Sequence, residues 1–388
     1  MLFDFDKPTN RRGTMSVKWD ETRNADELPL WVADMDFETA PAIVQAVMER
    51  ASQGIYGYVY PSQDYYDAII GWFKRRHNWH IEQDWIVYTP GVVPAISACI
   101  KALTHPGDGV IIQTPVYNCF FSSIRNNGCM TVESPLKRDG DTYVMDFDDL
   151  ERCCADERNH VLLLCNPHNP AGRVWTRDEL RRVDEICGRH GVTVISDEIH
   201  CELVFQRGGY VPYATVSQHP CVVCTAPSKA FNTAGLQTSN MVIADPTLRS
   251  RVNRAVNDNE VCDIGVFGPV ALIAAYNDGA EWLDQCVDYI HANYKYLCER
   301  LAGMPFDIQP VKLEGTYLAW VDVHVLCDAM KVNVDTLSEL LREKAGVWFT
   351  AGTAYGRDGE GYLRINLATQ RATLAEALTR LSAFVHTV

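Results

Sequence analysis

Three polar side chains of this 388-residue chain each follow a short apolar run, and their types suit catalysis on a small charged molecule. Asn169 comes after VLLLC, Asp197 after VTVIS and Lys229 after CVVCT. Each run is typical of a strand buried in a parallel sheet, and ligands of open α/β sheets bind beyond the carboxyl ends of such strands. We therefore expect the three side chains to meet at one edge of a sheet.

The chemistry of these three residues is complementary. Asp197 can hold a protonated ring nitrogen of a ligand, and Lys229 can act as a nucleophilic amine because burial lowers the pKa of lysine. Two Asn-Pro pairs hold the loop around Asn169 extended, which presents its amide as a fixed donor or acceptor. A surface position for Lys229 and an ordinary turn-rich loop around Asn169 are the alternatives.

Three more features suit a cofactor and a substrate. The predicted strand WIVYT is followed by Gly91 and Val92 at the start of a predicted helix, where backbone amides suit a phosphate. The predicted strand GVIIQT is followed by Tyr117, whose ring can stack on a flat ligand. Arg364 lies on an apolar strand near the C-terminus, where an arginine favours a carboxylate partner. An ordinary turn, a core aromatic residue and an internal salt bridge are the respective alternatives.

The order of these features is more specific than any one of them. A phosphate-binding helix start, an aromatic ring, an asparagine, an aspartate, a lysine and an arginine follow one another at successive strand ends. An enzyme that uses pyridoxal 5'-phosphate on an amino acid requires this set. We expect no metal site, because the CxxC of Cys221 and Cys224 has no second pair. The glycine fingerprint of dinucleotide-binding domains is missing as well.

Alternating strands and helices predict the architecture. Strands are expected at 85–89, 109–114, 161–165, 192–196, 221–225 and 241–244, and helices at 91–105 and 176–190. This alternation favours an α/β fold with a mostly parallel sheet. After about residue 265 the pattern changes to a long helix over 268–301, short strands and a final helix, which indicates a second, α+β domain. The N-terminal segment is expected to pack with that second domain.

Composition limits the partners and the compartment. Lys and Arg number 35 and Asp and Glu number 50, so the formal net charge is −15, which disfavours binding to nucleic acid. The sequence contains no apolar run of about 18 residues, so we expect no membrane span. The N-terminus lacks a signal-peptide pattern, and the 14 cysteines are scattered rather than framed. We therefore expect a cytoplasmic protein with reduced thiols.

The chain resembles the fold-type I pyridoxal phosphate enzymes of the class I/II aminotransferase superfamily. NPHNPAG (166–172), SDEIH (196–200) and APSKAFNTAGLQ (226–237) are similar to the asparagine loop, the aspartate segment and the cofactor-lysine segment of that superfamily. PLWVADMDF (29–37) and GIYGYVYP (54–61) are similar to its MalY/PatB branch of cystathionine β-lyases, or C–S lyases. The resemblance extends over nearly the whole chain.

This resemblance implies a fold and an assembly. It implies a large cofactor-binding domain over 48–283, with a mostly parallel seven-stranded sheet flanked by helices, as in aspartate aminotransferase. It implies a smaller, discontinuous α+β domain made of 1–47 and 284–388. The implied cofactor is pyridoxal 5'-phosphate, the implied substrate is a small amino acid, and the implied assembly is a homodimer with shared active sites.

The resemblance also implies roles for single residues. The implied catalytic residues are Lys229, which binds the cofactor and removes the substrate Cα proton, Asp197, which pairs with the pyridinium nitrogen, and Tyr117, which stacks on the ring. The other implied cofactor contacts are Gly91, Val92, Asn169, His200, Thr225, Ser228 and, from the neighbouring subunit, Tyr58. The implied substrate contacts are Arg364, which binds the α-carboxylate, Asn169 and Ala33.

Three positions depart from the pattern of many relatives. His200 stands where many aminotransferases have a tyrosine, although the MalY/PatB branch also has a histidine there. Gln237 stands where many relatives have a phosphate-binding arginine, and Ala226 lacks a hydroxyl that is often present. Phosphate binding is therefore expected to use backbone amides, Ser228 and the neighbouring subunit.

The resemblance implies cleavage of cystathionine or a related cysteine S-conjugate by β-elimination, which yields a thiol such as homocysteine, pyruvate and ammonia. Transfer of the amino group to a 2-oxo acid is the alternative, because the same residues serve both reactions. A non-catalytic relative that only binds the cofactor is disfavoured, since such a protein has no need of Lys229. The motifs do not specify the preferred leaving group.

Overall fold

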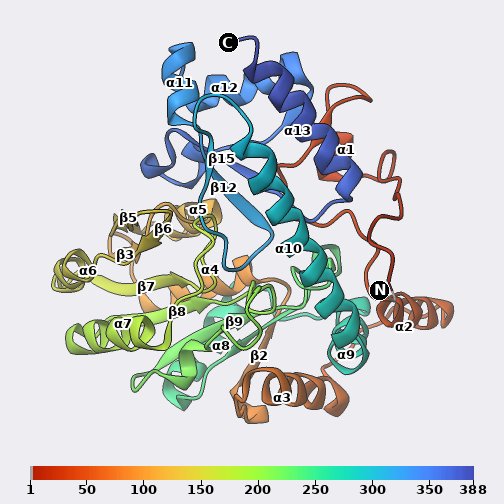
Figure 1. Ribbon diagram of the computed structural model, residues 1–388. Coiled ribbons are helices and arrows are strands. Elements are labelled where there is room, and N and C mark those ends of the chain that lie inside the picture. The colour runs from red at the N-terminus through yellow and green to blue at the C-terminus, as the bar shows by residue number, and fades with distance from the viewer. Residues whose placement is uncertain (1–2) are drawn as a thin grey trace.

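A seven-stranded sheet forms the centre of the computed structural model, which describes residues 3–388 (Figure 1). Its order is β2-β10-β9-β8-β7-β3-β4. The strands are β2 (Ile86–Thr89), β3 (Gly109–Ile112), β4 (Met130–Glu133), β7 (Asn159–Cys165), β8 (Thr193–Asp197), β9 (Cys221–Thr225) and β10 (Ser239–Val242). Only β10 runs against its neighbours among these strands. The predicted α/β fold with a mostly parallel sheet is confirmed.

Helices cover both faces of this sheet, because successive strand residues point to opposite sides. Leu163 of β7 packs into a core with residues of α4 (Val92–Leu103), α5 (Asn118–Asn126) and α8 (Pro246–Asp258). Its neighbours Leu162 and Leu164 belong to the larger core on the other side. Helices that contribute to this larger core are α3 (Gln63–His77), α6 (Phe147–Cys154), α7 (Arg177–His190) and α9 (Phe267–Asp278). Apolar residues on both faces explain why the strands read as continuous apolar runs.

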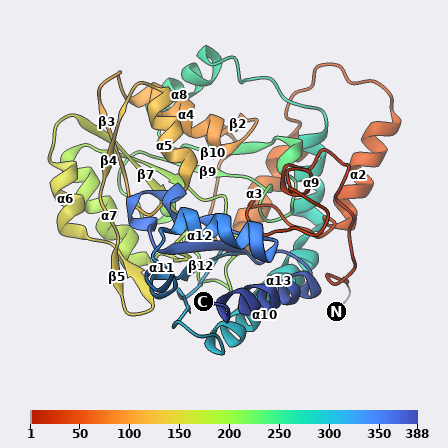
Figure 2. The ribbon, with the colours of Figure 1, turned by 90° about the horizontal axis from the view of Figure 1, so that it is seen from above.

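A smaller four-stranded sheet lies above the large sheet in the view of Figure 1. Its order is β11-β12-β15-β14, from β11 (Gln309–Pro310), β12 (Leu318–Asp322), β14 (Thr350–Ala351) and β15 (Tyr362–Asn366). The helices of this part are α10 (Ala280–Ala302), α11 (His324–Met330), α12 (Val334–Leu340) and α13 (Arg371–Val385). Figure 2 shows α10 and α13 side by side in this layer.

The N-terminal segment joins the two parts of the molecule. It forms α1 (Val17–Asp20) and β1 (Leu28–Pro29), and β1 pairs in parallel with β13 (Val347–Trp348). Helix α2 (Pro41–Ser52) then packs against α9. A two-stranded sheet of β5 (Lys137–Asp139) and β6 (Thr142–Val144) completes the set of sheets. The chain therefore passes from β13 in the C-terminal part to α9 within its first fifty residues.

The predicted helix over 268–301 is wrong as a single helix. The chain forms α9 and α10 instead, and Gly279 lies between them. A Cβ atom on Gly279 would lie 2.5 Å from Ala275 O and 2.6 Å from Phe231 Cε1. A glycine is needed at this corner because the ring of Phe231 approaches the backbone. Phe231 follows Lys229 by two residues in the chain.

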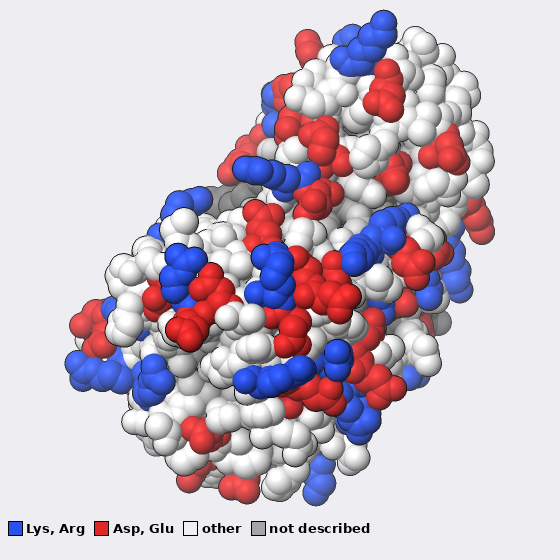
Figure 3. Space-filling view, turned by 90° about the vertical axis from the view of Figure 1, so that its left-hand side faces the viewer, with Lys and Arg blue, Asp and Glu red and all other residues white. Residues whose placement is uncertain are grey.

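Charged residues of both signs share the molecular surface. On the face shown in Figure 3, Lys and Arg are interspersed with Asp and Glu. Ion pairs between surface side chains include Arg152–Asp149 and Arg189–Glu151. Among residues 3–388, the structure contains no helix that is both long and apolar enough to cross a membrane.

Candidate active site

A cavity of about 360 Å³ lies where β7, β8 and β9 end and α4 begins. It is lined by residues that the sequence singles out, namely Ala33, Gly91, Val92, Tyr117, Asn169, Asp197, His200, Ser228 and Lys229. The parallel sheet explains this convergence, because β7, β8 and β9 are neighbours and all end at the same edge. The structure thus brings the expected asparagine, aspartate and lysine together.

Lys229 carries the amine of the cavity. Its Nζ donates a hydrogen bond to Ala33 O at 2.6 Å. Desolvation lowers the pKa of Lys229 to about 8, and the positive charge of Arg364 acts in the same direction, while the carboxylates of Asp34 and Asp197 oppose the shift. A lysine with this pKa is partly unprotonated near neutral pH and can therefore act as a base or a nucleophile.

Asp197 is the last residue of β8 and is 3% exposed. Its Oδ1 accepts a hydrogen bond from Ile199 N at 3.1 Å. Burial raises the pKa of Asp197 to about 6, although this hydrogen bond and the charge of Lys229 favour the ionised form. Among residues 3–388, no cationic side chain forms an ion pair with Asp197. A buried carboxylate of this kind suits a ligand that brings a protonated nitrogen.

His200 and Tyr117 present neutral groups to the same cavity. Burial lowers the pKa of His200 to about 3, with the charges of Lys229 and Arg364 acting in the same direction, so the imidazole is uncharged. Its buried Nδ1 has no hydrogen-bond partner within the described part of the chain. Burial raises the pKa of Tyr117, so its phenol remains protonated. Both side chains can therefore donate or accept a hydrogen bond without carrying a charge.

Arg364 adjoins the cavity from the small sheet. Its Nη1 donates to Asn169 Oδ1 at 3.3 Å and its Nη2 donates to Trp31 O at 2.8 Å. The guanidinium carbon lies 4.7 Å from the centre of the Tyr355 ring. Arg364 is 5% exposed, and none of the residues from 3 to 388 supplies a carboxylate within ion-pair distance of it. The arginine is therefore held by neutral groups, and its charge is available to an anionic ligand.

Three expected residues do not line the cavity. Arg364 reaches it through Asn169, as described above. Thr225, at the end of β9, is buried, and its Oγ1 finds no partner among the residues that the structure describes. Tyr58 is 99% exposed and therefore contributes nothing to the cavity of its own chain.

Sequence reasoning missed several residues that line the cavity: Pro90, Val93, Pro94, Cys165, Ile199, Ala234 and Thr238. Cys165 ends β7, and from the sequence it is interpreted only as a small apolar residue of the run VLLLC. Thr238 directly precedes β10, whose reversed direction brings its first residue to the edge where the parallel strands end. Gln237, which stands where many relatives have an arginine, also lines the cavity and has a left-handed backbone conformation with φ 50°. Only a known strand direction would have placed Thr238.

Glu198 directly follows Asp197 in the chain and is fully buried. Its carboxylate accepts hydrogen bonds from Ser196 Oγ at 2.8 Å, from Tyr213 N at 2.9 Å, and from the Tyr210 hydroxyl. Burial raises the pKa of Glu198 to about 7 even though these donors favour the ionised form. Asn166 also donates to Glu198, so this network fixes the loop that carries Asn169.

Comparisons with known proteins agree with this geometry. The family model described as aminotransferase class I and II matches residues 25–381. Cystathionine beta-lyase PatB of Bacillus subtilis (strain 168) is 39% identical over 98% of this chain and 99% of that protein. Protein MalY of Escherichia coli (strain K12) is 33% identical, with 98% of each chain covered. The structure of the PLP-bound C-S lyase from Staphylococcus hominis has a TM-score of 0.93 at 30% identity and covers 99% of this chain and 98% of its own.

Replacing Glu198 by glutamine is expected to change how stability depends on pH. The pKa of Glu198 is about 7 in the folded chain and near 4.5 in the unfolded chain, so its contribution to stability is fully present below pH 4.5 and is lost as the pH rises through 7. Glutamine does not titrate, so this loss does not occur in Glu198→Gln. The free energy of unfolding of the variant, relative to that of the native protein, should therefore increase by about 2 kcal/mol as the pH rises from 5 to 8. Urea unfolding at several pH values measures the difference.

Glu202→Gln is the matched control with the opposite sign. Burial opposes ionisation of Glu202, but His77 and Arg76 outweigh it and lower the pKa of Glu202. Its contribution is therefore present above the unfolded pKa, and Glu202→Gln should lose stability at neutral pH. Parallel pH profiles for the native protein and Glu198→Gln would contradict the prediction.

Proposed function

The chain belongs to the class I and II aminotransferase family, and from this premise we propose that it is a pyridoxal 5'-phosphate-dependent carbon–sulfur β-lyase. The enzyme cleaves cystathionine or a related cysteine S-conjugate to a thiol, pyruvate and ammonia. The observation that carries the proposal is that Lys229 and Asp197 line one cavity, which Arg364 adjoins through its hydrogen bond to Asn169. This cavity occurs in a chain that matches cystathionine β-lyases and C–S lyases over nearly its whole length.

The residues of the cavity fit the cofactor. Asp197 has no paired cation among residues 3–388, which suits the protonated ring nitrogen, and the unpartnered Thr225 Oγ1 suits a phosphate oxygen. Amides at the start of α4, beginning with Val92, favour the same phosphate, because the first turn of a helix leaves its N–H groups free. Gly91 and Ser228 line the cavity and would hold the phosphate, while Tyr117, Asn169 and His200 also line it and would contact the ring.

When bound, the cofactor supplies an electron sink that stabilises negative charge at the substrate Cα. Lys229 removes the Cα proton, because its lowered pKa leaves the amine partly unprotonated near neutral pH. Arg364 binds the α-carboxylate of the substrate, helped by Asn169, while Ala33 O holds the lysine amine in place. Asp197 keeps the ring nitrogen protonated through its negative charge.

Transamination by the same residues is the alternative activity, and product analysis separates the two. The protein is incubated with cystathionine, first alone and then with an added 2-oxo acid. We expect pyruvate, ammonia and a free thiol without any acceptor. Turnover that requires the 2-oxo acid and forms a new amino acid would overturn the lyase and favour an aminotransferase.

Lys229→Ala is expected to abolish turnover while leaving the fold intact. Removal of a positioned base costs up to about four orders of magnitude in rate, and the side chain makes one hydrogen bond, to Ala33 O. Lys101→Ala is the matched control, because Lys101 is exposed on α4 and bonds Asn259. Initial rates with cystathionine measure both variants, and a Lys229→Ala variant that kept its rate would refute the assignment of the base.

We also propose a cytoplasmic homodimer. Large side chains are exposed around the segment that follows α2, including Ile55, Tyr56, Tyr58 and Tyr60. Exposed apolar and aromatic side chains concentrated in one region favour an interface with another chain. Free cysteines, most of them buried, favour a reducing compartment. Within each subunit we propose a large domain over 48–283 and a small domain of 1–47 with 284–388.

In this dimer Tyr58 contributes to the active site of the neighbouring subunit, which subunit mixing tests. Lys229→Ala and Tyr58→Ala are each expected to be impaired, but a mixed dimer has one site with a native Lys229 and a native Tyr58. Random reassociation of equal amounts should restore about a quarter of the native activity. Mixing Tyr58→Ala with a Tyr58→Ala/Lys229→Ala double variant provides the control, since no native site forms. Activity equal in both mixtures would rule out a shared site.

A further inference from the structure

Residues 31–37 form no helix or strand, yet their backbone borders the active site. Side chains from distant parts of the chain satisfy the backbone oxygens of this 31–37 segment. Asn366 Nδ2 donates to Val32 O and Asp34 O, both at 2.6 Å. Asn232 donates to Met35 O at 2.9 Å and to Phe37 O at 3.0 Å. The position of the segment therefore depends on side chains rather than on regular secondary structure.

Two oxygens of the 31–37 segment hold the residues that act on the substrate. Ala33 O accepts from Lys229 Nζ at 2.6 Å and from the Tyr317 hydroxyl at 2.9 Å. Trp31 O accepts from Arg364 Nη2 at 2.8 Å. A shift of this segment would therefore move the partners of both the base and the carboxylate-binding arginine.

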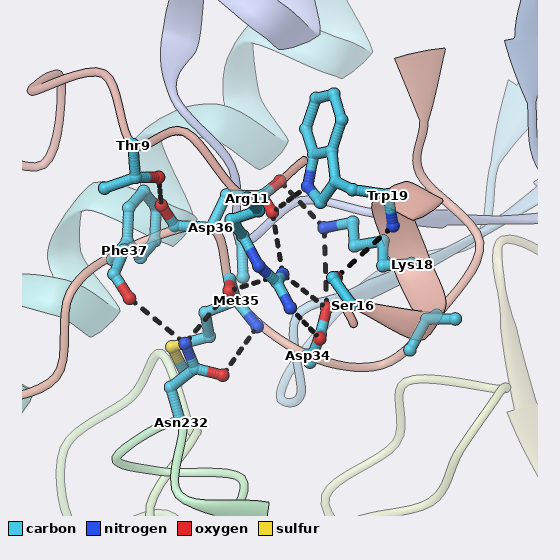
Figure 4. A network of polar contacts seen from close by, with 12 residues as sticks. Thr9, Arg11, Ser16, Lys18, Trp19, Asp34, Met35, Asp36, Phe37 and Asn232 are labelled. Atoms are coloured by element: carbon cyan, nitrogen blue, oxygen red, sulfur yellow. Dashed lines mark hydrogen bonds and ion pairs between the residues drawn. The ribbon is translucent and has the colours of Figure 1, made fainter. Parts of the chain in front are cut away.

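On its other side the segment is fixed by a buried ion cluster, made of Arg11, Lys18, Asp34 and Asp36 (Figure 4). Lys18 is 0% exposed, and its Nζ lies 2.8 Å from Asp36 Oδ2 and 3.7 Å from Asp34 Oδ1. Arg11 pairs with Asp34 at 2.6 Å and with Asp36 at 3.0 Å, and it also donates to Met35 O. The Trp19 indole donates to Asp36 Oδ1 at 2.7 Å.

We propose that Lys18 and Asp36 are positioning residues of the active site, which set the 31–37 segment and through it the placement of Lys229 and Arg364. The inference rests on the proposed function for the roles of those two residues. The cluster contains two cations and two carboxylates, so its charges balance, and its Lys18–Asp36 pair is buried while the Arg11 and Asp34 side chains are 22% and 21% exposed. Removal of Lys18 or Asp36 leaves the cluster with one uncompensated charge, and the segment that carries Asp34 and Asp36 must shift so that the remaining ions find water or share the remaining partners.

A nearby exposed ion pair shows why burial matters. Lys7 and Glu38 form an ion pair of 2.9 Å just beyond the 31–37 segment, with side chains that are 57% and 63% exposed. Water and salt screen such a pair, so it adds little to stability or position. Lys7→Met therefore matches Lys18→Met in chemistry, since each replaces an ion-paired lysine by methionine, but not in burial.

The experiment compares Lys18→Met, Asp36→Asn and Trp19→Phe with the control Lys7→Met in the cofactor-loaded enzyme. In Lys18→Met and Asp36→Asn, KM for the amino-acid substrate should rise about tenfold and kcat should fall about tenfold, so that kcat/KM falls by about the hundredfold that a 1 Å misplacement can cost. The double variant should be no worse than either single one, because it removes one cation and one carboxylate and leaves Arg11 paired with Asp34. Trp19→Phe should show a smaller change of the same kind, and Lys7→Met should show none.

Amide hydrogen exchange gives a second readout that requires no activity. In Lys18→Met and Asp36→Asn we expect faster exchange in the 31–37 segment and around Asn232, with β7, β8 and β9 unchanged. If Lys18→Met does not fold, the isosteric Asp36→Asn and the mild Trp19→Phe carry the same test. Native kinetics in Asp36→Asn, or faster exchange throughout the molecule, would overturn the proposal. Local exchange changes in a protein without lyase activity would instead overturn only the proposed function.

Discussion

The desolvated amine of Lys229 is the constraint on which the active site depends. Desolvation of the amine and the positive charge of Arg364 lower the pKa of Lys229 to about 8. Desolvation also raises the pKa of Asp197 to about 6 and keeps His200 uncharged. Desolvation thus has three effects. It makes Lys229 a base, it keeps His200 neutral, and it makes the charged form of Asp197 unfavourable unless a cation pairs with it. The protein must hold these groups close together without letting them neutralise one another.

The sheet meets this requirement by geometry. Asp197 lies opposite Cys165 and Cys224 in the parallel register, so the loop with Asn169 and the turn with Lys229 begin on either side of the aspartate. Arg364 comes from a separate sheet and donates hydrogen bonds to two uncharged oxygens, Asn169 Oδ1 and Trp31 O. Its positive charge is therefore not neutralised by a carboxylate of the described residues. The strand ends of the large sheet therefore position the residues proposed to contact the cofactor, and the small sheet positions the arginine proposed to contact the substrate.

The sequence alone was enough to predict the buried strands and the residues that follow them. Apolar runs such as VLLLC predict buried strands. A polar residue that follows such a run must lie at the carboxyl end of the strand, where ligands of parallel sheets bind. Strand β4 was missed because Met130–Glu133 is an edge strand with mixed polarity. Direction was not predictable for β10, since an apolar run reads alike in both directions. The break at Gly279 also escaped prediction, because it depends on the approach of Phe231 from a distant part of the chain.

Residues without secondary structure were the hardest part of the site to predict, and the reason is physical. A strand takes its position from backbone hydrogen bonds, which follow from a local pattern of residues. The 31–37 segment takes its position from Lys18, Asn232 and Asn366, which lie far apart in sequence. Their polar side chains look like ordinary surface residues until the fold buries them. An active site built in this way has a geometry that depends on buried charge balance, so it is sensitive to substitutions that never touch the substrate.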